Sequence, residues 1–153
     1  MKPIRNSIKA IIIRDHQLLA IKKEDENGFY YILPGGGQEK DETFHVALKR
    51  ECLEEIGVDI LIGELRYIRE YLGKNHGIAH VDYDAHQVEF MFLCHLADGA
   101  EPRSGTSPDE GQVAVEWIEL GKLNDCRFYP MALRPILSSW MRTAVPVYLG
   151  DVN

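Results

Sequence analysis

Hydrophobic residues in this chain of 153 residues fall into short runs that polar segments separate, a pattern typical of strands joined by turns. Residues 7–13 are rich in isoleucine and predict a buried strand. A polar turn follows, and residues 18–22 predict a second strand that pairs with the first as a hairpin. Later strands are predicted at residues 29–33, 60–71, 87–96 and 113–118.

Two other segments carry apolar residues at helical spacing. Residues 43–56 contain neither Gly nor Pro and precede Gly57, the residue type that most often ends a helix. Residues 130–143 predict a C-terminal amphipathic helix. Its apolar stripe consists of Leu133, Ile136, Leu137 and Trp140. Strands on both sides of a central helix predict a single α/β domain, residues 1–153, in which helices cover a mixed sheet.

The central helix carries apolar residues and carboxylates on different sides. Its apolar flank consists of Leu48, Cys52 and Ile56. At 3.6 residues per turn, Glu51, Glu54 and Glu55 lie together on another face. Like charges at this spacing destabilise an isolated helix by roughly 0.2–0.5 kcal/mol per pair, so the cluster favours a bound cation. Mg²⁺ and Mn²⁺ prefer oxygen ligands, and the sequence therefore predicts a divalent metal site on this face.

Glycines precede this helix and complete a recognisable spacing. Two adjacent glutamates on a helix usually form a solvated face without a function. The run Gly35, Gly36 and Gly37 changes that interpretation, because glycine lets the backbone approach a ligand closely. The full motif spans residues 36–58 and consists of Gly36, Glu42, Arg50, Glu51, Glu54, Glu55 and Gly57. In this form it resembles the signature box of the Nudix hydrolase family.

The resemblance implies a Nudix-like α/β/α sandwich, in which a mixed β-sheet lies between helices, and a metal site with defined ligands. Glu51, Glu54 and Glu55 would bind Mg²⁺ or Mn²⁺. The carbonyl of Gly36 would be a further ligand. The implied cofactor is therefore one divalent cation or more, held by oxygen atoms alone.

The resemblance also implies that Arg50, a member of the catalytic set, pairs with Glu42 and holds the loop against the helix. Glu42, Gly35 and Gly37 would then be structural residues within the site. Two positions depart from the usual form of the motif. Asp41 stands where Gly is common, and Cys52 stands where a larger aliphatic residue is common. Asp tolerates turn conformations and Cys acts as a small hydrophobe, so neither departure predicts a loss of chemistry.

Charged residues outside the motif supply candidates for the base and for substrate binding. Glu110 lies in the polar loop at residues 97–112, and some family members use a glutamate of this loop as base or metal ligand. The catalytic set is thus Arg50, Glu51, Glu54 and Glu110, with Glu51 and Glu110 as alternative bases and a solvated loop carboxylate as the other interpretation of Glu110. The candidates for contact with substrate phosphates are Arg66, Arg69, Lys22 and Lys23, although surface solubility explains each of them equally well.

A second group of metal-ligand residue types alternates along residues 80–86. His80, Asp82, Asp84 and His86 would share one face of an extended strand. We favour the simpler interpretation, in which these residues form the polar face at the start of an edge strand.

Composition limits the partners and the compartment. A formal net charge of −7 argues against binding of a nucleic-acid polymer, which requires a clustered basic surface. The three cysteines are widely spaced and predict reduced thiols and a cytoplasmic location. No apolar run approaches the roughly 20 residues of a membrane span, so we expect a soluble protein. Family members are often dimers, which makes a homodimer an open alternative to a monomer.

The expected reaction is hydrolysis of a nucleoside diphosphate linked to another group X, giving a nucleoside monophosphate and X-phosphate. The substrate would be a small-molecule nucleotide, either a nucleoside triphosphate or a related compound. Two alternatives remain. One is a regulatory module that binds nucleotides without catalysis, against which the complete set of acidic residues counts. The other is an isoprenyl-diphosphate isomerase, which would need a catalytic cysteine such as Cys94.

Overall fold

The computed structural model describes residues 2–76, 82–140 and 144–153. Its strands are β1 (Arg5–Arg14), β2 (Gln17–Asp25), β3 (Gly28–Ile32), β4 (Gly35–Gly37), β5 (Ile60–Leu72), β6 (His86–Leu96), β7 (Gln112–Glu119) and β8 (Tyr148–Asp151). Its helices are α1 (Phe44–Ile56), α2 (Gly73–His76) and α3 (Leu133–Ser138), with a 3₁₀ helix, η1 (Leu120–Asp125), before α3.

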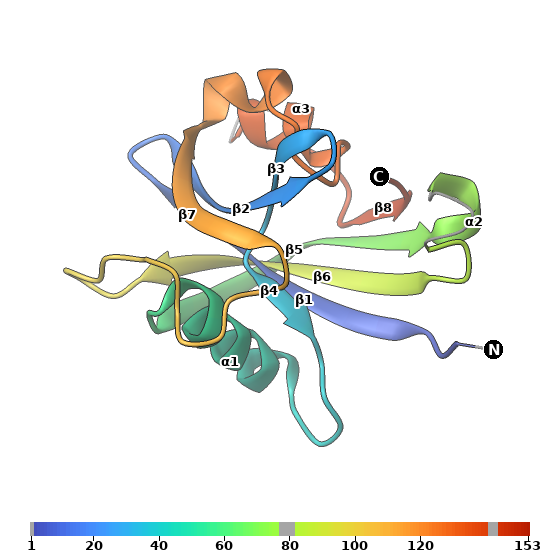
Figure 1. Ribbon diagram of the computed structural model, residues 1–153, viewed down its shortest axis with the longest axis horizontal. Helices are drawn as coiled ribbons and strands as arrows, with labels where there is room; N and C mark the ends of the chain where they lie inside the picture. Colours follow the sequence, from blue (N-terminus) through green and yellow to red (C-terminus); the bar gives the residue numbers. More distant parts are fainter. Residues whose placement is uncertain (1, 77–81, 141–143) are drawn as a thin grey trace.

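The strands form one mixed sheet with the order β3-β2-β1-β6-β5-β8, to which β4 adds beside β1 and β7 beside β2. The pair β1 and β6 is parallel, whereas β5 and β6 are antiparallel. Figure 1 shows α1 on one side of β1, β5 and β6, with α3 and the β2, β3 and β7 strands on the other side. The predicted mixed sheet between helices is confirmed.

The first strand, β1, is buried on both faces and joins two apolar clusters. Ile8 and Ile12 pack into the cluster that contains the buried side of α1. Ile11, which points to the opposite face, packs into the cluster that contains α3 and η1. Successive side chains of a strand alternate between faces, so an unbroken apolar run is what a strand between two layers requires.

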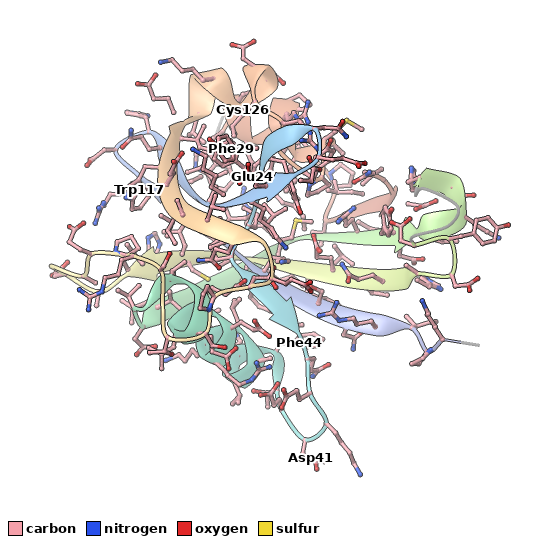
Figure 2. All side chains as sticks on the ribbon, viewed as in Figure 1. Glu24, Phe29, Asp41, Phe44, Trp117 and Cys126 are labelled. Atoms are coloured by element: carbon pink, nitrogen blue, oxygen red, sulfur yellow. The ribbon has the colours of Figure 1, made fainter. Side chains whose placement is uncertain are left out.

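The central helix begins and ends as its sequence predicts. The Thr43 hydroxyl accepts a hydrogen bond from the Val46 amide at 3.2 Å, which satisfies one amide of the first turn. Gly57 ends the helix with a φ of 70°, in the left-handed region that glycine adopts without strain. Asp41, at the tip of the preceding loop, has a φ of 69° (Figure 2). The loop therefore keeps a left-handed residue at this position although it is not glycine.

Several predicted bounds were wrong. The second strand continues through Asp25, so the turn before β3 is shorter than expected, and the glycine run forms strand β4 instead of a loop. Residues 73–76, expected in a polar loop, form α2. The C-terminal helix has 6 residues, and the end of the predicted one, residues 141–143, lies outside the described part. Strand β8 and η1 were not predicted.

The described residues contain no helix that combines the length and the apolar character of a membrane span. The three cysteines are free thiols.

The close approach of β4 to β1 gives a stability prediction. Gly35 has a φ of 128°, and a Cβ atom on it would lie 2.1 Å from the carbonyl oxygen of Ile8. We expect Gly35→Ala to lower the free energy of unfolding by at least about 2 kcal/mol more than Gly28→Ala, measured by urea denaturation. Gly28 is the matched control, because its φ is 106° but nothing lies within 4 Å of an added Cβ. Equal losses would contradict the close packing of β4.

Candidate active site

Strand β4 brings bare backbone against the carboxylates of α1. Gly36 lies opposite Ile8 in the antiparallel pair of β4 and β1, and this pairing holds β4 to the sheet. A Cβ atom on Gly36 would lie 2.6 Å from the carboxyl carbon of Glu51. The amide of Gly35 donates a hydrogen bond to Glu55 Oε1 at 2.7 Å. A side chain at Gly36 would therefore push the Glu51 carboxylate away from the strand.

Arg50 joins the loop, the glycine strand and the helix. Its Nε and Nη2 atoms donate to the two oxygens of Glu42 at 2.6 and 3.0 Å, so the predicted pair is present and bidentate. Nη2 also donates to the carbonyl of Gly37 at 3.0 Å. The hydrogen bonds from Arg50 lower the pKa of Glu42 to about 2, and the hydrogen bond from the Glu39 amide is the second largest cause of this shift. Glu42 is thus a permanent anion at neutral pH.

The same guanidinium contacts two of the proposed metal ligands. Arg50 Nη1 donates to Glu51 Oε1 at 3.0 Å and lies 3.6 Å from Glu54 Oε2. The side chains of these glutamates are 18% and 38% exposed. Arg50 therefore offsets part of the charge repulsion that the sequence pattern creates on this face.

Glu55 differs from its two neighbours because it is buried. The expectation that all three carboxylates lie on an open face was wrong for this residue, which is 2% exposed beneath Gly35. Burial raises the pKa of Glu55 to about 7, against the charge of Lys9 and the Gly35 amide, which lower it. The Lys9 ammonium donates to the Leu33 and Gly35 carbonyls at 3.3 and 3.0 Å.

A cleft of about 710 Å³ opens beside this arrangement. The glycine strand and Glu51 form one wall, and the loop before β7 contributes Glu110 to another. The structure therefore brings Glu51 and Glu110, the two alternative bases, to one cavity. The cationic residues that line it are Arg5, Lys9, Lys23 and Arg69.

Of the residues predicted to bind substrate, Arg69 and Lys23 line this cleft, and Lys22 and Arg66 do not. Lys22 pairs with Glu116 at 3.0 Å, and Arg66 pairs with Glu64 at 2.9 Å. Neither side chain reaches the cleft, because successive residues of a strand point to opposite faces of the sheet. The same alternation along β1 places Arg5 and Lys9 at the cleft, two residues that the sequence pattern did not indicate.

The alternating group at residues 80–86 offers no assembled metal site in the described part of the chain. His80 lies outside the described residues. The Asp82 carboxylate accepts a hydrogen bond from the Tyr71 hydroxyl, and the His86 ring contacts Glu70 at 3.3 Å. These contacts agree with the interpretation of a polar strand end.

The cysteine that an isomerase would need lies in the core. Cys94 is fully buried in the apolar cluster under α1. Burial raises the pKa of its thiol to about 12, which leaves almost no thiolate at neutral pH. Cys94 is therefore a packing residue.

The residues present fit a divalent ion by their donor chemistry. Glu51, Glu54 and the Gly36 carbonyl offer oxygen atoms only, the ligands that Mg²⁺ and Mn²⁺ prefer. The bare Cα of Gly36 keeps the space beside the Glu51 carboxylate open. Within residues 2–76, 82–140 and 144–153, no three His, Cys, Asp or Glu side chains are already arranged as metal ligands. Glu51 and Glu54 would exchange contact with Arg50 for contact with the ion.

Comparisons with known proteins agree with this geometry. The sequence matches the NUDIX domain family over residues 3–140. A MutT-like protein of Streptomyces ambofaciens is 34% identical over 113 residues, which are 73% of this chain and 62% of that protein. The chain thus spans less than two thirds of that relative's length.

Solved structures show the same fold. A MutT Nudix hydrolase from Burkholderia pseudomallei superposes with a TM-score of 0.65 at 26% identity, over 92% of this chain and 99% of that one. A Nudix hydrolase from Nitrosomonas europaea superposes with a TM-score of 0.72 at 20% identity, over 100% of this chain and 81% of that one.

The buried carboxylate predicts an unusual pH dependence of stability. The pKa of Glu55 is about 7 in the folded protein and 4.5 for an ordinary glutamate, so the wild type loses stability as pH rises between these values. With a chelator present, we expect Glu55→Gln to be more stable than wild type at pH 8, by up to about 3 kcal/mol, and nearly equal at pH 4.5. Urea denaturation at both values measures this. Glu54→Gln is the matched control, because it removes a carboxylate of the same helix that is 38% exposed instead of buried.

Proposed function

The chain belongs to the Nudix family, and from this membership we propose that it is a metal-dependent pyrophosphohydrolase that cleaves a nucleoside diphosphate linked to a group X. One observation carries the proposal. Glu51 of α1, the glycine backbone of β4 and an acidic loop meet at one cleft that also holds four cationic side chains. Such a cleft suits an anionic substrate that reaches the carboxylates together with a divalent cation.

We assign the metal to Glu51, Glu54 and the Gly36 carbonyl, with the free oxygen of Glu55 as a further ligand. Bound Mg²⁺ or Mn²⁺ would neutralise phosphate charge and lower the pKa of a coordinated water. Deprotonation of Glu55, whose pKa burial raises to about 7, is favoured by a nearby cation. Arg50 and Glu42 hold the loop in place, and Glu51 and Glu54 would hold the ion.

The reaction is attack of water on one phosphorus, with cleavage of the bond from that phosphorus to the bridging oxygen. The products are a nucleoside monophosphate and X-phosphate. We propose Glu110 as the group that accepts the proton from water, because Glu51 is engaged by Arg50 and by its role as ligand. Lys9, Lys23 and Arg5 face the cleft and would bind the phosphate oxygens.

Aromatic residues that line the cleft suit the nucleoside. Tyr30 and Tyr129 line it with their ring centroids 6.0 Å apart. Arg69 connects the cleft to an adjoining hollow that Tyr71 also lines. Flat side chains of this kind stack on a base of any identity, which supports a nucleotide as substrate without selecting the base.

The activity itself is directly testable. We expect the purified protein to release nucleoside monophosphate from at least one member of a panel of nucleoside triphosphates, nucleotide sugars and dinucleoside polyphosphates when Mg²⁺ or Mn²⁺ is present. Excess chelator should abolish the release. Tight nucleotide binding with no turnover of any compound would favour the regulatory module instead.

Glu54→Gln tests the ligand assignment. Loss of one ionised oxygen ligand should lower kcat by about 10²-fold or more and weaken Mn²⁺ binding, with the fold retained. Kinetics and calorimetric titration with Mn²⁺ measure the two effects. Glu119→Gln is the matched control, because Glu119 lies at the end of β7 and pairs only with Lys122 among the described residues. Wild-type turnover in Glu54→Gln would refute the assignment.

A further inference from the structure

The loop before β7 is docked on the C-terminal end of α1. Its amides donate to three successive carbonyls of the last turn: Arg103 to Ile56 at 2.9 Å, Gly105 to Glu55 at 3.1 Å, and Ser107 to Glu54 at 3.0 Å. The last carbonyls of a helix have no partner within the helix. The loop supplies those partners, and Figure 1 shows it passing beside α1.

The docking requires close contact of backbone with backbone. A Cβ atom on Gly105 would lie 2.3 Å from the carbonyl oxygen of Glu54. No side chain fits at that distance, so glycine permits the approach. The loop is therefore held to the helix turn that carries Glu54 and Glu55, two of the proposed metal ligands.

Gln112, the first residue of β7, connects the loop to α1 through its side-chain amide. Its Nε2 atom donates to the Glu55 carbonyl at 2.9 Å. Its Oε1 atom accepts from the Asp109 amide at 3.0 Å, and its own backbone amide donates to the Asp109 carbonyl at 2.9 Å. One end of the amide thus binds α1, and the other end binds the acidic loop.

The two acidic residues of the loop have different surroundings. Asp109 pairs with Lys23 at 2.9 Å and accepts from the Glu110 amide at 3.0 Å, so its carboxylate is occupied in fixing the loop. Among the described residues, no hydrogen bond or ion pair reaches the Glu110 carboxylate. Glu110 therefore has a fixed backbone and an available side chain at the cleft.

We propose that Gln112 is a positioning residue that holds Glu110 at the cleft in a fixed relation to the carboxylates of α1. The proposal rests on the function proposed above. The role needs an amide, because the side chain must donate to a carbonyl and accept from an N–H group at once. A hydrocarbon makes neither bond, and a carboxylate would place an acceptor against the Glu55 carbonyl.

The test is a double-mutant cycle between residues 110 and 112. We expect Gln112→Met to lower kcat by about 10–100-fold with little change in KM, as for loss of a supporting contact. In the Glu110→Gln background the same substitution should change kcat by less than about twofold, since the residue that it positions is gone. Gln17→Met, at the start of β2, is the matched control and should leave turnover unchanged. Equal losses in both backgrounds would overturn the proposal.

Hydrogen exchange tests the Gln112 hydrogen bonds to the loop and to α1 independently of catalytic activity. In Gln112→Met, the amides of Asp109, Gly105 and Ser107 should exchange faster than in wild type, while those of β1 stay protected. Unchanged exchange would overturn the proposal even where the wild type is active. If no compound of the panel is hydrolysed, the proposed function fails. Hydrogen exchange then still tests whether Gln112 holds the loop to α1. Gln112→Glu, which is similar in size, repeats both measurements should Gln112→Met fail to fold.

Discussion

The arrangement depends on the narrow space between β1 and α1, into which a strand of three glycines fits. A backbone without side chains can pair with β1 on one edge and still touch the carboxylates of the helix. Gly35 donates to Glu55 across this space, and Arg50 reaches the Gly37 carbonyl from the helix. The helix, the loop and the sheet are thereby fixed relative to one another, and Glu51 and Gly36 take their places at the cleft as a result.

Electrostatics then give three adjacent glutamates of one helix different properties. Glu51 and Glu54 share a guanidinium and stay partly solvated, so each can exchange that contact for another cation. Glu55 is buried, and its raised pKa makes its charge dependent on a nearby cation. Because the buried Glu55 holds its proton more tightly than an ordinary glutamate, the folded protein avoids part of the cost of three uncompensated charges on this helix.

Much of the fold was predictable because side-chain patterns record burial. The long strands and α1 were found from apolar periodicity, and the Arg50–Glu42 pair was found from a motif. Strand β4 was missed because glycine leaves no pattern, and the docking of the loop on α1 was missed because it uses backbone atoms. The burial of Glu55 was missed for a related reason: helical periodicity treats glutamate as polar, and its buried partner is a backbone amide. Lys22 and Lys23 are neighbours in the sequence, and only the register of the sheet decides which one reaches the cleft.

The cleft is assembled from segments far apart along the chain, with Arg5 on β1, Glu51 on α1 and Tyr129 beyond η1. Contacts between residues so far apart in the sequence close large loops, and closing them costs conformational entropy. A growing chain that ends with β6 would already carry the charged turn of α1, but it would lack the loop that docks on the end of this helix and the residues of that loop that line the cleft. The binding surface thus exists only after residues from Arg5 to Pro130 have been synthesised and have folded together, so ligand recognition cannot precede that stage of biosynthesis.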